Sequence, residues 1–126
     1  MTTEAITTRT GKIWLRADGI VQAVLISPNS QHSLEDAQAN IAAVAALHPA
    51  KRRPMLIDMR AAQKIEREVR VYYSSVEVST ARALLVGSPV SQVIANFFIS
   101  LGRHPVPTRL FTSETEAVAW LKNFIE

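Results

Sequence analysis

The chain has 126 residues, of which 48% are apolar and 20% are charged, and its formal net charge at pH 7 is +3. This length fits one folded domain whose core needs neither disulfides nor a metal ion. The absence of cysteine excludes a disulfide framework, a thiolate metal site and a cysteine nucleophile, and it fits a reducing cytoplasm. We therefore predict a single cytoplasmic domain over residues 1–126, in which residues 1–11 form a loosely attached arm.

The chain opens with the pattern of a β-hairpin. Two β-rich runs, Ile13–Arg16 and Ile20–Ile26, flank the sequence Ala17, Asp18 and Gly19. An Asp-Gly pair between two such runs is a strong signal for a tight turn. We therefore expect an antiparallel pair of strands at this end of the chain.

Beyond the hairpin, stretches with helical spacing of apolar residues alternate with short apolar runs. Helices are expected to begin near Ser33, near Ile65, after Ser88 and after Ser113, and Pro49 and Gly102 are expected to end the first and third helices. Strands are expected at Pro54–Met59, Ala81–Val86 and Thr108–Thr112. The order β-β-α-β-α-β-α-β-α predicts an α/β fold with a mixed, mostly parallel sheet.

The helices are expected mainly on one face of this sheet. Right-handed crossovers between parallel strands that add in one direction place their helices on the same side. A sheet covered on one side alternates apolar and polar residues along its strands. Gln22, Arg82 and Arg109 are the strand residues that indicate this alternation.

One stretch, Ala83–Gly102, carries no charge and has the length of a membrane span. Gly87, Ser88 and Pro89 interrupt it, and its remaining polar side chains would each be costly in hydrocarbon. We therefore expect a strand, a turn and a helix there, and no membrane span.

The order of elements and three segments, Asn96–Phe98, Pro107–Thr112 and Glu116–Leu121, resemble bacterial STAS-like domains. These domains are related in fold to anti-sigma-factor antagonists and to CRAL-TRIO lipid-binding domains. The resemblance implies a regulatory or protein-interaction role. In the antagonists, a phosphorylatable serine begins the helix after the strand that here contains Asp58, but Met59, Arg60, Ala61 and Ala62 follow in this chain. The usual phosphoserine switch is therefore not expected.

No catalytic, metal or cofactor motif is recognisable in the sequence. It lacks a nucleophile elbow, a phosphate-binding loop and a dinucleotide fingerprint. The histidines, His32, His48 and His104, are far apart and are expected at the surface or at helix ends, so we expect no metal site. The basic run Lys51–Arg53 has no interleaved aromatic or glycine residue and is expected to be a solvated loop, with no nucleic-acid partner.

Asp58, Arg60 and Ser88 are the candidate ligand-binding residues. Asp58 and Arg60 follow a central strand, and open α/β sheets bind ligands at the carboxyl ends of their strands. Ser88 stands at a helix start, where an anion is favoured. The alternatives are a local ion pair between Asp58 and Arg60 and a plain N-cap role for Ser88.

The third expected helix carries an uncharged polar stripe, in which Ser88, Gln92, Asn96 and Ser100 recur at every fourth residue. Such a stripe can form hydrogen bonds across a contact without the desolvation cost of ions. Gln92, Asn96 and Ser100 are therefore the candidate interface residues, with a homodimer as the expected assembly. A partly covered surface helix is the alternative.

Together these features predict a non-catalytic STAS-like regulatory or protein-interaction module without the usual phosphorylatable serine. The alternative is a domain that binds a small apolar or anionic, lipid-like ligand. A third class is an enzyme that uses Asp58 with Arg60, or His104, for acid–base chemistry.

Overall fold

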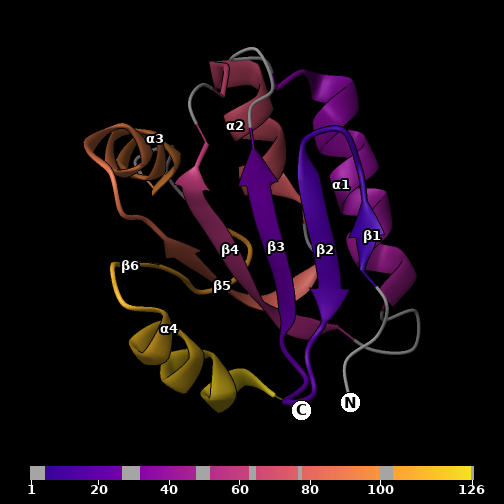
Figure 1. The fold of residues 1–126 in the computed structure, drawn as a ribbon, viewed down its shortest axis with the longest axis vertical. Coiled ribbons are helices and arrows are strands. Elements are labelled where there is room, and N and C mark those ends of the chain that lie inside the picture. Colours follow the sequence, from indigo (N-terminus) through magenta and orange to yellow (C-terminus); the bar gives the residue numbers. More distant parts are fainter. Residues whose placement is uncertain are drawn as a thin grey trace.

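A six-stranded sheet, in which the strands follow one another in chain order, forms the centre of this computed structural model (Figure 1). The structure describes residues 5–26, 32–47, 52–62, 65–76, 78–99 and 104–125. The strands are β1 (Ile6–Thr7), β2 (Gly11–Leu15), β3 (Val21–Ile26), β4 (Arg53–Ala61), β5 (Ser79–Leu85) and β6 (Thr108–Phe111). The helices are α1 (Leu34–Leu47), α2 (Arg67–Ser75), α3 (Pro89–Ile99) and α4 (Glu114–Leu121), which the 3₁₀ turn η2 (Lys122–Phe124) follows.

The predicted sheet type and hairpin are confirmed. Strands β1, β2 and β3 pair antiparallel, whereas β3, β4, β5 and β6 pair parallel. In the β2–β3 turn, Gly19 has a φ of 88°, a backbone conformation that favours glycine. The carboxylate of Asp18 accepts a hydrogen bond of 3.2 Å from the backbone N–H of Ile20, which closes the turn.

The N-terminal segment differs from the expected loose arm. Ile6 and Thr7 pair with Ile13 and Lys12 as β1, and Thr10 is completely buried. The segment is therefore attached to the sheet through β1, and Thr10 lies in the interior. Residues 1–4, the rest of the expected arm, lie outside the described residues.

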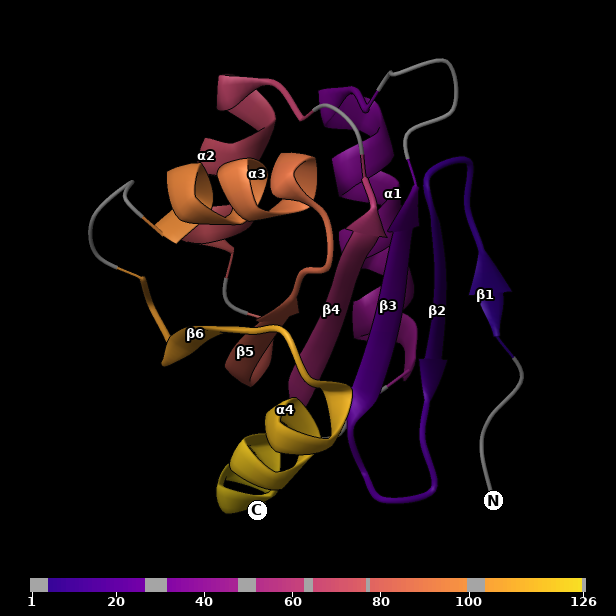
Figure 2. The same ribbon diagram turned by 60° about the vertical axis from the view of Figure 1, so that its left-hand side comes forward.

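Helices α1, α2 and α3 cover one face of the sheet, as expected from the crossover rule, and α4 covers the other. Residues of α1, α2 and α3 form a core with Leu25, Met59 and Leu84. The alternate strand residues Leu56 and Leu85 pack instead against α4. In Figure 2, α1 lies behind the sheet and α4 in front of it. Because α4 follows the last strand, it belongs to no crossover and the handedness rule does not place it.

The polar strand residues only partly follow the predicted alternation. Gln22 and Arg109 alternate with residues that face α1 to α3, and so belong to the opposite face. Arg82, in contrast, lies on the covered face and is only 4% exposed. The interpretation of Arg82 as a sign of an open face was wrong, because its guanidinium finds partners beneath α2.

The predicted starts of α1, α3 and α4 are confirmed, and α2 begins at Arg67, two residues after Ile65. The hydroxyl of Ser33 accepts from the N–H of Asp36, and Ser113 accepts in the same way from Glu116. Pro89 is the first residue of α3. Strand β4 is longer than predicted. The expected helix ends at Pro49 and Gly102 lie outside the described residues.

Within the uncharged stretch, residues 83–99 form the end of β5, a turn and α3, as predicted. Within the described ranges, no helix is long and apolar enough to cross a membrane.

Candidate functional site

Asp58 and Arg60 form a close ion pair at the carboxyl end of β4. The guanidinium donates to the carboxylate through Nε at 3.0 Å and through Nη2 at 2.7 Å, and the backbone N–H of Arg60 donates at 3.0 Å. The Asp58 side chain is 9% exposed and the Arg60 side chain 51%. Glu114, in the first turn of α4, lies 3.9 Å from the same guanidinium, and these neighbouring carboxylates raise the pKa of Arg60.

Ser88 lies next to this pair and caps α3. Its hydroxyl accepts from the N–H of Ser91 at 3.1 Å, and the hydroxyl of Ser91 accepts from the N–H groups of Gly87 and Ser88. The side chain of Arg60 runs past Gly87, since a Cβ atom there would stand 3.2 Å from Arg60 Cγ and Cδ. The structure thus places Arg60, which is paired with Asp58, against Gly87, the residue before Ser88. Both local alternatives, the ion pair and the N-cap, are present, while ligand binding stays a prediction.

The exposed side of α3 carries no charge. Gln92 and Asn96 are both exposed there, and they share this side with Val90 and Val93, which are 50% and 53% exposed. We call these four residues the α3 outer face. Ser100, the remaining candidate interface residue, lies outside the described residues.

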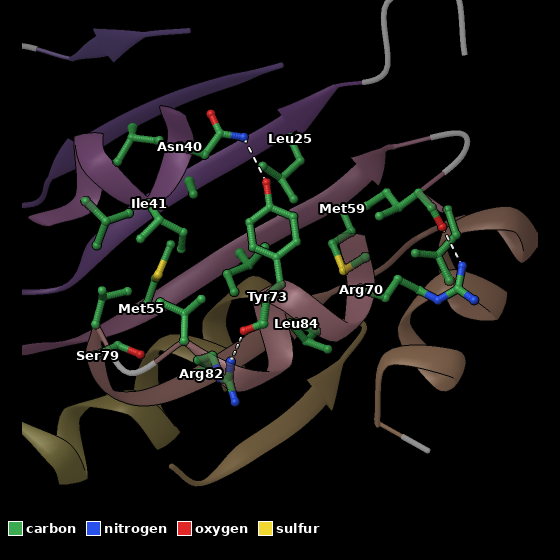
Figure 3. A pocket seen from close by; sticks show the side chains of 18 residues that line it. Leu25, Asn40, Ile41, Met55, Met59, Arg70, Tyr73, Ser79, Arg82 and Leu84 are labelled. Atoms are coloured by element: carbon green, nitrogen blue, oxygen red, sulfur yellow. Dashed lines mark hydrogen bonds between the residues drawn. The ribbon is translucent and has the colours of Figure 1, made fainter. Parts of the chain in front are cut away.

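A cavity of about 50 Å³ lies between the sheet and helices α1 and α2 (Figure 3). Its walls are mainly aliphatic and thioether side chains, among them Ile41, Val44, Met55, Ile57, Met59 and Leu84. Polar residues reach it from three elements, α1 (Asn40), α2 (Tyr73) and β5 (Arg82), and Tyr73 lies between the other two in Figure 3.

A buried hydrogen-bond network joins α1, α2 and the β1–β2 turn, and we call its members Thr8, Thr10, His32, Asn40 and Tyr73 the Asn40 network. The amide nitrogen of Asn40 donates to Thr10 Oγ1 at 2.9 Å and to the Tyr73 hydroxyl at 3.0 Å. The amide oxygen of Asn40 accepts from Thr8. The Tyr73 hydroxyl lies 2.7 Å from Nε2 of His32. Sequence reasoning missed this cluster and expected His32 at the surface or at a helix end. His32 directly precedes Ser33, the N-cap of α1, but it is only 3% exposed.

Burial changes the protonation of this network. It lowers the pKa of His32 below the ordinary value of 6.5, and it raises the pKa of Tyr73. Both side chains are therefore neutral at pH 7. The sequence carried one signal for the buried amide, since Asn40 lies three residues after Ala37 and four before Val44 on the same helical stripe.

Next to the Asn40 network, Arg9 forms an ion pair with Asp36 in the first turn of α1. Nε of Arg9 donates to Asp36 at 2.9 Å, and Nη2 of Arg9 pairs with the other carboxylate oxygen. Asp36 also accepts from the N–H of Ser33 at 2.8 Å. These hydrogen bonds, chiefly that from Arg9, hold the pKa of Asp36 well below its usual range.

Arg82 donates hydrogen bonds to the backbone carbonyl groups at the C-terminus of α2. Its guanidinium donates to the carbonyl oxygens of Tyr73 at 2.7 Å and Ser74 at 3.3 Å, and to Thr108 Oγ1 at 3.2 Å. A cation at this end of a helix is favoured by the helix dipole. Burial lowers the pKa of Arg82 to about 10, so the group stays charged at pH 7.

Two further sequence predictions concern metal binding and phosphorylation. Among the residues that the structure describes, no three His, Asp or Glu side chains gather in a way that could hold a metal ion. The residue at the start of α2 is Glu66, whose side chain makes no cap hydrogen bond. The position implied for a phosphorylatable serine therefore has no hydroxyl.

The fold and its contacts define a mixed α/β domain with three helices on one sheet face, one on the other, and a small apolar cavity. The family model described as "Domain of unknown function (DUF7793)" matches residues 13–125, and the chain belongs to this family. It is 35% identical to a crystallised protein with unknown function from Arthrobacter sp. FB24, over 92% of this chain and 95% of that chain, with a TM-score of 0.36.

A second solved structure with a detectable likeness is an uncharacterized protein from the DUF3478 family with a SpoIIAA-like fold, from Shewanella loihica PV-4. It is 12% identical over 95% of this chain and 93% of that chain, with a TM-score of 0.46. None of the curated proteins compared with this chain matches it.

Proposed function

We propose that this chain is a non-catalytic, STAS-like interaction module that pairs with a second copy of itself through the α3 outer face. The observation that carries the proposal is the combination on that face of two half-exposed valines and two exposed amides, on a helix without a charged residue. Surface helices usually carry charges on their solvent side. This face can be covered without removing an ion from water.

A second copy suits this face better than an unrelated partner does. In a two-fold contact each residue meets the same surface on the other molecule, so any charge on the face would approach a like charge. An uncharged face avoids this repulsion. The chain as a whole carries a net charge of +3, and association through an uncharged helix keeps those charges apart.

A non-catalytic role is supported by the engagement of the acidic and basic side chains. Asp58 is bound by Arg60, Asp36 by Arg9, and Nε2 of His32 by Tyr73. An acid or base for catalysis has to reach a substrate, and these groups are turned toward the protein. The proposed location is the cytoplasm, in line with the cysteine-free sequence.

A lipid-like ligand has less support. The cavity of about 50 Å³ has about one third of the volume of an engineered cavity, of roughly 150 Å³, that binds benzene. A lipid chain would require the helices to move apart. Stabilisation by lipids, nucleotides or phosphate in a thermal-shift screen would nevertheless favour this alternative.

The test of the proposed function is sedimentation velocity of the full chain over a range of concentrations. We expect a dimer that Asn96→Glu converts to monomer, because the two-fold contact brings two new carboxylates together. Gln38→Glu, on the exposed side of α1, is the matched control and should leave the dimer intact. A monomeric parent chain, or equal dissociation in both variants, would refute the proposal.

A further inference from the structure

The hydrogen bond between His32 and Tyr73 has a defined direction. Asn40 uses its amide hydrogens on Thr10 and on the Tyr73 hydroxyl. The Tyr73 hydroxyl thus accepts from Asn40 and has its own hydrogen left to donate. Its neighbour at 2.7 Å is Nε2 of His32, which accepts this hydrogen in the neutral ring.

This direction makes the contact sensitive to protons. In a neutral imidazole whose Nε2 accepts, the hydrogen is on Nδ1. Nδ1 of His32 is buried and has no hydrogen-bond partner among the residues that the structure describes. A proton added at Nε2 would turn this atom into a donor that faces the O–H donor of Tyr73, and the hydrogen bond between them would be lost. The charged ring would then be buried with its Nε2–H facing another donor and its Nδ1–H without an acceptor among the described residues. Burial of a charge in this state is strongly unfavourable.

The charged and titratable groups around His32 do not remove this cost. Asp36 on α1 attracts a charged imidazole. Arg9, from the β1–β2 turn, already pairs with Asp36 and repels the charged imidazole. From α2, the facing groups are the phenols of Tyr73 and, against its ring, Tyr72. Burial raises the pKa of Tyr73, so its phenol is neutral near pH 7.

Tyr73 is also the point at which α2 is fastened to α1 over the cavity. Its ring lines the cavity. Its hydroxyl is hydrogen-bonded to Asn40 of α1 and to His32, which directly precedes the N-cap of α1. Loss of the Tyr73 contact therefore weakens the attachment of α2 to α1.

We propose that the His32–Tyr73 hydrogen bond is a proton-operated latch, which holds α2 against α1 while His32 is neutral and releases α2 from the cavity when His32 takes up a proton. The released state exposes the apolar cavity walls, among them Val44 and Met59. The latch goes beyond the proposed pairing through α3 and does not depend on it.

The test is amide hydrogen exchange of the full chain, followed by NMR between about pH 7.5 and about pH 5 and corrected for the intrinsic exchange rate. If opening takes up one proton, the equilibrium constant for opening increases up to about tenfold for each pH unit below pH 6.5. The increase stops where the closed state itself becomes protonated. We expect this loss of protection for the amides of α2 but not for those of β3 and β4. His32 nitrogen shifts should show the Nδ1–H form at neutral pH and charging over the same window.

Two variants separate the latch from general acid sensitivity. His32→Gln, which keeps hydrogen-bonding atoms but does not titrate, should make the protection of α2 independent of pH. His104→Gln should behave like the parent chain. Uniform loss of protection in all elements, an unchanged pH response in His32→Gln, or an Nε2–H tautomer of His32 at neutral pH would overturn the proposal. The tautomer measurement needs no variant and so remains decisive if His32→Gln does not fold.

Discussion

Gly11 and Asn40 lie so close that a Cβ atom on Gly11 would stand 2.9 Å from Oδ1 of Asn40. The backbone of β2 thus makes room for the amide that holds the Asn40 network. We expect Gly11→Ala to destabilise the protein by about 1–3 kcal/mol, because Asn40 has to turn away from its partners. Urea unfolding measures this loss.

The control for that substitution is Gly87→Ala. Its Cβ atom would meet only the methylene groups of Arg60, at 3.2 Å, and this half-exposed side chain can move. We expect a loss below about 1 kcal/mol. An equal loss in the two variants would contradict the special role of Gly11.

Asn40→Ala is expected to cost about 2–3 kcal/mol, since it leaves buried groups of Thr10 and Tyr73 without their donor. Gln38→Ala, on the exposed side of the same helix, should change stability by less than about 0.5 kcal/mol. In the Asn40→Ala background, Gly11→Ala should lose most of its effect, because the two changes disturb one contact. Strict additivity in this double-mutant cycle would show that they act independently.

The stability of the protein is expected to fall with acidification in two stages. Since the folded state lowers the pKa of His32, the unfolded state binds more protons as the pH drops through and below 6.5, and the free energy of unfolding decreases there. Asp36 adds the second stage, because its pKa is lowered from an ordinary value of 3.8. Its contribution is complete well above 3.8 and is lost as the pH falls below it.

Urea unfolding as a function of pH tests both stages. His32→Gln should remove the first stage and keep the second. Arg9→Ala should reduce the second, because Arg9 is the main reason for the lowered pKa of Asp36. A parent chain whose stability is the same at pH 7 and at pH 4, within about 0.5 kcal/mol, would contradict the expected sign.

The cavity should accept one additional methyl group. Val44 is buried and lines the cavity, so Val44→Ile adds apolar contacts without displacing neighbours and should stabilise by up to about 1 kcal/mol. Val69 of α2 is equally buried, in the neighbouring core cluster, but is not part of the cavity wall. Val69→Ile should therefore overpack and cost about 1–3 kcal/mol. Thermal unfolding of both variants gives the comparison.

The elements that the sequence predicted well carry their own local signals. The Asp18–Gly19 turn and the serine caps at Ser33 and Ser113 all depend on contacts within a few residues. Strand β1 gave no such signal, because two residues among threonines show no periodicity. Its pairing with β2 is a tertiary contact that only the folded sheet supplies.

The candidate site was predictable only in part, for a similar reason. The proximity of Asp58 and Arg60 follows from their spacing along one strand, and they meet as expected. Arg82 was assigned to the wrong face because an arginine in a strand normally points to solvent. Its partners are carbonyl groups at the end of α2, which no local pattern reveals. The burial of His32 was missed because its partner Tyr73 is distant in sequence.

The order of the strands in the sheet has a consequence for how the chain assembles. Since each strand lies beside its neighbours in sequence, none has to be inserted between two that have already paired. A growing chain emerging from the ribosome can add strand after strand to one advancing edge, starting from the first hairpin. Helix α4, which follows β6 along the chain, then covers the back of the finished sheet at β4 and β5.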